Sequence, residues 1–235
     1  MTLQGTLTAD AGHGGNGVAG ESSGLGGAGV AGGHDGGDGA YGIDVEPLNG
    51  ADGLGTGAGR GGTDLGPGAG ASYGSQGGNA ALGDAVAGRT YGNAELDPLE
   101  PGSGAGGGSG GEACGGGGGG GGGGIIKLSV LGDLRLGTNS VISANGGNGG
   151  TDDDASCGGG GGGSGGTIWL RANNFLNDGL ISAQGGIGIG GLSNIGPVGG
   201  YGRVRIDQED PTGTGLELPR SGLDGGSWYV SADNP

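Results

Sequence analysis

Large apolar side chains are scarce in this sequence. Leucine, isoleucine, valine and phenylalanine make up 40 of its 235 residues, and phenylalanine occurs once. With a formal net charge of −16, that fraction is typical of intrinsically disordered chains. The apolar residues gather in a few alternating runs, however, which indicates order instead. No run reaches the roughly 18 residues that a membrane span needs, so none is predicted.

Basic residues are also few, at 8 against 24 acidic ones. Such a polyanion repels nucleic-acid phosphates and anionic lipids, so we expect neither as a partner, and no insertion into a membrane. Most acids lie in glycine-rich segments and are interpreted as a solubilising coat. Residues 1–5 lack the basic and apolar parts of a secretory signal, so the sequence does not reveal an export route.

Groups that carry catalysis are nearly absent. His13 and His34 are the only histidines, and no serine or cysteine lies in a recognisable nucleophile motif, so we expect neither an enzyme nor a cofactor. Residues 152–154 and the acids around His34 raise the question of calcium. Neither group repeats with the period of calcium-binding β-rolls, so solvated turns are favoured and no metal site is predicted.

Proline numbers only 8, which argues against collagen although glycine numbers 78. Collagen also needs glycine at every third position, and residues 125–137 break that period. The high glycine content therefore needs a structural explanation other than a collagen triple helix.

The sequence contains internal repeats, which indicate how the chain is organised. Segments starting at Thr2, Leu136 and Leu176 align, and the last two start 40 residues apart. The aligned columns are Leu7, Ile142 and Ile181; Ala9, Ala144 and Ala183; and Asp10, Asn145 and Gln184.

A second set of similar segments follows the glycine tracts. Its columns are Ile126, Ile168 and Val204, then Leu128, Leu170 and Ile206. The residues of the other parity are mostly charged or polar and include Lys127 and Arg205, with Trp169 as an exception. This alternation predicts half-buried β-strands.

The tracts at 115–124 and 158–166 are almost pure glycine and have no side chains to pack. A buried extended helix with about three residues per turn must then bond laterally to its neighbours. From Ala11 onward, one of three registers is rich in side chains, and the other two are enriched in glycine, although imperfectly. The residues that share the first register are His13, Asn16, Ala19, Ser22, Leu25, Ala28, Ala31, His34 and Ala40. The predicted fold is therefore a bundle of polyglycine II helices with short β-strands, in about three repeats of 40 residues, with almost no α-helix.

Domain organisation follows from these repeats. Residues 1–208 are predicted to form one polyglycine II and β-strand domain, in which 18–112 is a long glycine-rich insertion. Within it, the proline-containing stretches from Ile43 and Asn93 are interpreted as loops or short strands outside the core. Residues 209–235 break the pattern and are interpreted as a tail that serves assembly.

Two stretches carry a family resemblance, 158–170 (GGGGGGSGGTIWL) and 141–150 (VISANGGNGG). They resemble glycine-rich repeats of large bacterial surface proteins. The glycine tracts are also similar to those of the anaplastic lymphoma kinase receptor ectodomain, snow-flea antifreeze proteins and phage tail-fibre tip adhesins. The resemblance covers about residues 1–206 and implies bundled polyglycine II helices. It leaves the function open, because these families do unrelated things.

The two cysteines, Cys114 and Cys157, open successive glycine tracts at nearly equivalent positions. If the tracts pack side by side the sulfurs meet, so a disulfide is favoured over two buried free thiols. A zinc site is disfavoured, because neither cysteine has a second cysteine or a histidine nearby. A disulfide would indicate an extracellular or cell-surface setting.

The two ends of the chain look complementary. The N-terminal strand at 3–9 lacks a preceding strand, and the strand at 203–207 lacks a following one. They are expected either to pair within one chain or to join copies head to tail into a filament. The residues predicted to take part in assembly are Leu3, Leu7, Val204, Ile206, Trp228 and Tyr229.

Three functions compete at this point. The first is a self-assembling filament or surface-matrix subunit. The second is an adhesin for a cell-surface ligand, which would present Tyr41, Tyr73 and Tyr91 on exposed loops. The third is an ice-binding protein, which would need a flat face of alanine, threonine and valine.

Overall fold

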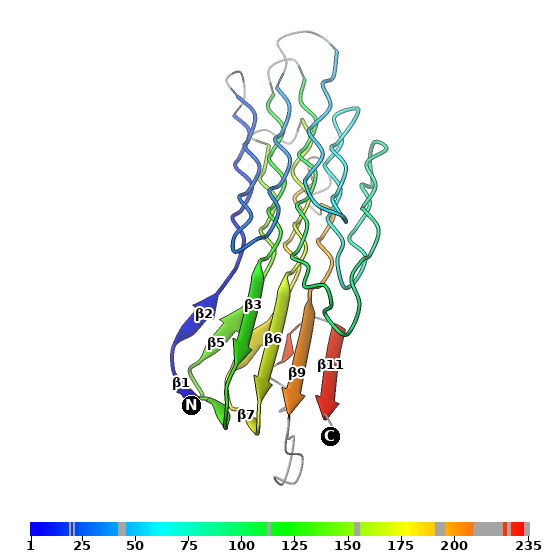
Figure 1. Ribbon diagram of the computed structural model, residues 1–235. Helices are drawn as coiled ribbons and strands as arrows, with labels where there is room; N and C mark the ends of the chain where they lie inside the picture. The colour runs from blue at the N-terminus through cyan, green and yellow to red at the C-terminus, as the bar shows by residue number, and fades with distance from the viewer. Residues whose placement is uncertain are drawn as a thin grey trace.

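A computed structural model describes residues 1–235 except 19, 21, 42–45, 112–113, 153–155, 191–195, 209–222, 225–226 and 233–235. For 223–224 and 227–232 it describes the backbone alone. The molecule is elongated, with β-strands at one end and long glycine-rich segments extending from them (Figure 1). The described part of the chain contains no helix, in agreement with the predicted near-absence of α-helix.

Eleven short strands form in the described residues. They are β1 (Thr2–Leu3), β2 (Thr6–Thr8), β3 (Ile125–Ser129), β4 (Leu134–Leu136), β5 (Val141–Ser143), β6 (Thr167–Ala172), β7 (Phe175–Asn177), β8 (Leu180–Ser182), β9 (Arg203–Gln208), β10 (Leu223–Asp224) and β11 (Ser227–Ala232).

The strands form three sheets in which every pair is parallel. The sheet orders are β1-β4-β7, β10-β8-β5-β2 and β11-β9-β6-β3. The chain runs through β3, β4 and β5, leaves along a glycine-rich excursion, and returns to β6, β7 and β8 (Figure 1). Each passage therefore adds one strand to each sheet, and the last of the three sheets, with the longest strands, is called the long-strand sheet.

The predicted apolar columns are confirmed by the strand register. Ile126 pairs with Ile168, which pairs with Val204, and Leu7, Ile142 and Ile181 are likewise in register. All of these side chains except that of Leu7 share one hydrophobic core with Leu134, Leu136 and Phe175 from the β1-β4-β7 sheet. The sequence did not predict that three sheets contribute to this core. The second strand of each passage, β4 or β7, lies outside the aligned columns and was not predicted.

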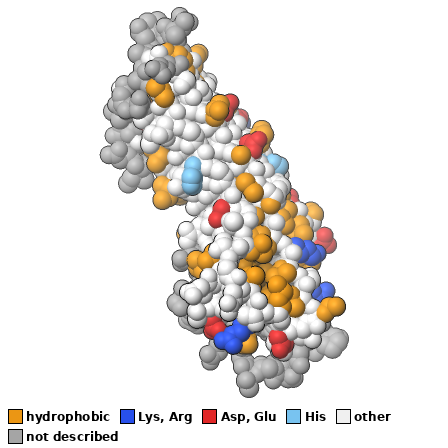
Figure 2. Space-filling view, turned by 90° about the vertical axis from the view of Figure 1, so that its left-hand side faces the viewer, with side chains coloured by type: hydrophobic (Ala, Val, Ile, Leu, Met, Phe, Trp, Pro, Cys, Tyr) orange, Lys and Arg blue, Asp and Glu red, His pale blue; other side chains and the backbone are white. Residues whose placement is uncertain are grey.

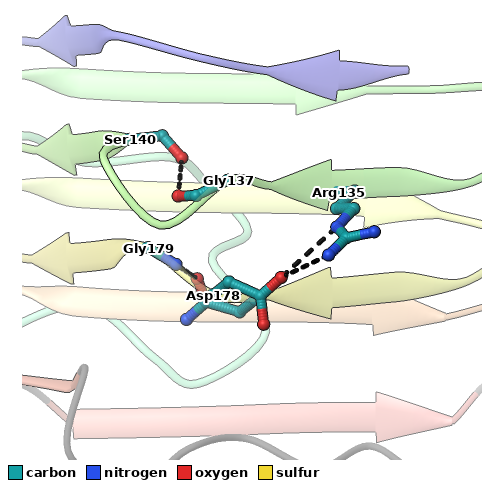
Figure 3. A network of polar contacts seen from close by, with 6 residues as sticks. Arg135, Gly137, Ser140, Asp178 and Gly179 are labelled. Carbon is teal, nitrogen blue, oxygen red and sulfur yellow. Dashed lines mark hydrogen bonds and ion pairs between the residues drawn. The ribbon is translucent and has the colours of Figure 1, made fainter.

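Turns between the strands are held by short-range polar contacts (Figure 3). Ser140 donates to the carbonyl of Gly137, and the amide of Gly179 donates to Asn177. Arg135 and Asp178, from successive passages, form an exposed ion pair at 2.9 Å. The ion pair links successive passages, and the other two contacts each stabilise one turn.

Backbone hydrogen bonds hold the glycine tract 115–124 in the middle of the excursions. Its amides bond in three registers, each to a different segment. Gly116, Gly119 and Gly122 donate to Ala40, Gly37 and His34; Gly117, Gly120 and Gly123 donate to Gly158, Gly161 and Ser164; and Gly118, Gly121 and Gly124 donate to Gly15, Gly12 and Ala9.

Three further segments donate to the carbonyls of the same tract. They are represented by Gly24 and Gly27, by Gly102, Ala105 and Gly108, and by Gly147 and Gly150. Six segments thus surround this tract, and almost every peptide group in it is paired. The tract is buried without a hydrophobic core of its own.

Glycine is required in the tract because neighbouring backbones occupy the space of a side chain. A Cβ at Gly120 would lie 1.9 Å from the carbonyl oxygen of Gly147, and one at Gly118 would lie 2.0 Å from that of Leu25. Elsewhere in the excursions, most buried positions hold small residues, including Ala69, Ala71, Ala105, Ser103, Ser109 and Ser164.

The C-terminal part differs from its predicted role as a tail that breaks the pattern. Strand β10 pairs with β8, and β11 pairs with β9 over its full length, with Trp228 opposite Val204 and Val230 opposite Ile206. This continuation was not predicted, because only two residues link β10 to β11 and no glycine tract marks it.

Candidate functional site

The ends of the three sheets are the first candidate site. Strands β1, β2 and β3 are edge strands at one end, and β7, β10 and β11 are edge strands at the other. No described strand covers these edges. An uncovered parallel edge offers unpaired amides and carbonyls to another chain.

The predicted assembly residues divide between these edges and the interior. Leu3 and Leu7 lie on β1 and β2, where Leu3 packs against the core and Leu7 is 37% exposed. Trp228 and Tyr229 lie on β11.

Val204 and Ile206 are in a different position. Both are buried in the core on β9, which has β6 on one side and β11 on the other. The expectation that 203–207 is an unpaired strand, or one that pairs with 3–9, is wrong, because β11 occupies that edge.

A row of cations and aromatic rings crosses the outer face of the long-strand sheet. Lys127, Trp169 and Arg205 are neighbours in register on β3, β6 and β9. The Lys127 ammonium lies 3.8 Å from the centre of the Trp169 ring, and the Arg205 guanidinium carbon lies 5.1 Å from it. Both are within the range of cation–π attraction. Tyr229 holds the next register position, on β11.

Asp207 anchors this row. Its carboxylate accepts from the Trp169 indole at 2.7 Å and pairs with Arg205 at 2.8 Å. The same alignment that gave the apolar columns also places Lys127, Trp169 and Arg205 in one column. That alternation was the signal that could have identified the row from sequence.

Positive charge is concentrated at this end of the molecule. Four of the eight basic residues belong to the outer register of the long-strand sheet: Lys127, Arg171, Arg203 and Arg205. On the face shown in Figure 2, basic side chains lie over the strand-containing half only, and acids are spread along the whole length. The outer face of the long-strand sheet therefore carries more positive charge than the rest of this acidic protein.

Of the three tyrosines expected on exposed loops, Tyr73 is buried. Tyr73 is 1% exposed, its hydroxyl lies 2.6 Å from that of Thr167, and its ring centre lies 4.6 Å from that of Tyr91. Arg203 donates to the carbonyl of Tyr91 at 2.7 Å. The expectation that Tyr73 is exposed is wrong, because the loop that carries it folds back onto the long-strand sheet.

Burial controls the chemistry of this tyrosine pair. Desolvation raises the pKa of both Tyr73 and Tyr91 above the ordinary value for a phenol, although hydrogen bonds to Thr167 and Ser103 oppose the rise. Leu96, predicted to lie in a loop outside the core, is 3% exposed as well. The contacts of Tyr73 with Thr167 and of Tyr91 with Arg203 fasten the long insertion to the sheet.

The predicted disulfide is confirmed. Cys114 and Cys157 are bonded, their Cα atoms are 6.0 Å apart, and both are buried. The bond forms because the glycine tracts that follow the two cysteines lie side by side, as the 3.0 Å hydrogen bond from Gly117 to Gly158 illustrates. It cross-links two excursions in the glycine-rich part.

Acidic side chains in the glycine-rich part accept hydrogen bonds from backbone amides. Asp35 and Asp38 accept from the amides of Gly29 and Gly26, each at 2.7 Å. Within the described ranges, no three histidine, cysteine, aspartate or glutamate side chains gather as metal ligands. Two of the residues considered for calcium, Asp153 and Asp154, lie outside the described residues.

No helix long and apolar enough to cross a lipid bilayer occurs in the part of the chain that the structure describes. Comparison with protein-family models, with curated proteins and with solved structures found no match to this chain.

Proposed function

We propose that this chain is an extracellular structural protein that assembles head to tail into a filament or surface matrix. We further propose that its glycine-rich part is a bundle of polyglycine II helices built on three repeats. The support for the bundle is the three-residue step of its hydrogen bonds and the six neighbours of tract 115–124. An extended helix with about three residues per turn points successive amides in three directions.

The observation that carries the assembly proposal is the match between the two ends of the long-strand sheet and of the β10-β8-β5-β2 sheet. Because all pairings are parallel, β11 of one copy would meet β3 of the next in the same direction as its own neighbours. The register would bring Tyr229 of one copy beside Lys127 of the next and so continue the alternating row. Strands β10 and β2 would meet in the same way.

The extracellular setting is supported by the disulfide between Cys114 and Cys157, since such bonds persist in oxidising compartments. A scaffold of this kind requires no catalysis, metal or cofactor. Its partner is a second copy of itself.

The assembly proposal is tested at the exposed edge of β3. The amide of Val130 donates to Arg171 of β6 at 2.8 Å. Successive amides of a strand point to opposite sides, so the amide of Ser129 faces the uncovered edge. Ser129→Pro removes that donor and adds a ring at the edge without a change in the core.

We expect the wild-type chain and the control Ser129→Ala to form filaments at high concentration, and Ser129→Pro to stay monomeric with the same melting temperature. Light scattering and negative-stain electron microscopy measure this. A wild-type chain that is monomeric at every concentration, or a Ser129→Pro variant that assembles equally well, would refute head-to-tail stacking.

A further inference from the structure

A polar groove lies on the glycine-rich part, next to the ends of three strands of one sheet. It forms where three extended segments, 9–17, 143–151 and 182–189, run side by side after β2, β5 and β8. Gly14 donates to the carbonyl of Asn148 at 2.8 Å, and Gly149 donates to that of Ile187 at 2.9 Å. The first segment lies on the left of Figure 1, the side that faces the viewer in Figure 2.

Side chains on this face are fixed in a ladder. In each step, an amide of one segment donates to a side chain of the preceding segment. The pairs are Asn145 to Asp10 (2.6 Å), Asn148 to His13 (2.9 Å), Thr151 to Asn16 (3.1 Å), Gln184 to Asn145 (2.8 Å) and Ile187 to Asn148 (2.9 Å). Each of these five side chains is thereby held by its acceptor atom.

The ladder leaves a set of donors on the surface. Because Oδ1 of Asn145 and of Asn148 accepts a backbone amide, the Nδ2 groups of both are left for another partner. His13 accepts through Nδ1, so the neutral ring carries its hydrogen on Nε2. No described protein group accepts from these three donors.

The donors line a cavity of about 300 Å³. Its other lining side chains include Asp10, Gln184 and Ile187. Ile187 is 61% exposed and supplies an apolar contact, whereas Asp10 and Gln184 supply oxygen acceptors. The groove therefore offers prearranged donors and acceptors at low cost in side-chain entropy.

The lining selects against two classes of ligand. An anion would meet the Asp10 carboxylate and a protein of net charge −16. A purely apolar ligand would leave the amide groups without partners after they lose water. A ligand rich in hydroxyl and ether oxygens, without charge, matches donors, acceptors and the apolar patch together.

The spacing adds a further requirement. Asn145 and Asn148 occupy equivalent places three residues apart, which corresponds to about 9 Å in an extended threefold helix. Equivalent donors at a regular interval suit a ligand that is itself a linear repeat. We propose that this groove binds a neutral, linear polysaccharide, a role that goes beyond self-assembly.

The competing explanation is that the ladder only provides hydrogen-bond acceptors for backbone amides at the edge of the glycine-rich part. Asparagine-to-aspartate substitutions separate the two roles. Asn145→Asp and Asn148→Asp keep the oxygen that accepts the backbone amide and remove the outward Nδ2 donor. Asn16→Asp makes the same change in the same ladder, where Asn16 accepts from Thr151 but does not line the groove.

The probes are neutral linear hexasaccharides of glucose and of N-acetylglucosamine, titrated by calorimetry to millimolar concentration. We expect one series to bind, the double variant Asn145→Asp/Asn148→Asp to lose at least about tenfold in affinity, and Asn16→Asp to bind like wild type. Gln184→Trp, which fills the groove and leaves the ladder intact, should abolish binding.

Ser129→Pro should bind the sugar as well as wild type does, so a failure of filament assembly does not affect this test. No binding of either series, an equal loss in Asn16→Asp, or full affinity in Gln184→Trp would each overturn the proposal. Thermal melts of every variant ensure that the comparison is made between folded proteins.

Discussion

The interiors of the strand region and of the glycine-rich region are stabilised by different interactions. In the strand region, large side chains such as Ile168 and Leu170 point inward from three sheets and are fully buried. In the glycine-rich region, large side chains are mostly kept outside, and backbone fills the interior. The first region depends on apolar area removed from water, the second on paired peptide groups.

The difference shows what glycine contributes at high density. Each glycine costs roughly 0.5 to 1 kcal/mol in extra chain entropy, and each hydrogen bond returns a net amount of about 1 kcal/mol. For an isolated segment, the entropy cost and the hydrogen-bond gain nearly cancel. The net free energy becomes favourable when a segment such as 115–124 has neighbours on all sides and nearly every amide is paired.

The largest expected effect comes from one methyl group inside the glycine-rich region. Gly120→Ala places a Cβ 1.9 Å from the backbone oxygen of Gly147, and no side-chain movement relieves that contact. We expect a loss of about 4 kcal/mol or more in the free energy of unfolding, measured by urea denaturation. Gly132→Ala is the control, because its Cβ would meet no atom within 4 Å. Equal stability of the two variants would contradict the required close approach of backbones.

Removal of the disulfide should weaken the glycine-rich region more than the strand region. Cys114 and Cys157 are 43 residues apart, and the chain-entropy model gives a loss of about 4 kcal/mol for a loop of this size. Hydrogen exchange of Cys114→Ala/Cys157→Ala should show faster exchange in tracts 115–124 and 158–166 than in β6. Faster hydrogen exchange in the strands alone would contradict the expectation that the disulfide stabilises mainly the glycine-rich region. Reduction of the wild-type protein provides the matched control.

A cavity in the strand region should cost somewhat less. Leu170 is fully buried, and Leu170→Ala removes its contacts in the shared core. We expect a loss of about 3 kcal/mol in unfolding free energy by thermal or urea denaturation. Leu131→Ala, at a fully exposed leucine, should change stability by less than about 0.5 kcal/mol. A small effect at Leu170 would indicate that the sheets do not depend on this core.

The smallest effect concerns the contact between the two regions and depends on pH. Burial raises the pKa of Tyr91 in the folded protein above its unfolded value of about 10, so the folded state holds this proton more tightly. The stabilisation is complete below pH 10 and is lost as the pH rises above it, by at most about 1.4 kcal/mol per pH unit for each such tyrosine. Tyr91→Phe should make the decline between about pH 10 and pH 12 shallower. An unchanged slope would mean that Tyr91 titrates as if exposed.

Much of the strand region could be predicted from sequence because its side chains alternate. The columns through Ile126 and Leu7 are in register, and the disulfide joins the cysteines that open equivalent tracts. The same reasoning failed at the C-terminus, where β11 follows β10 without a glycine excursion. It also failed at Tyr73, because burial there depends on a loop that returns from the far part of the chain.

The sequence by itself determined which residues face inward on β3, β6 and β9, and that glycine must carry the rest of the chain. Only the tertiary structure decided which segments are neighbours, that β9 is covered, and that Asn145 and Asn148 form a ladder with Asp10 and His13. The reason is physical. Side chains of different size and polarity identify the strands that carry them, whereas glycine segments are chemically alike, and their order is fixed only when all of them pack together.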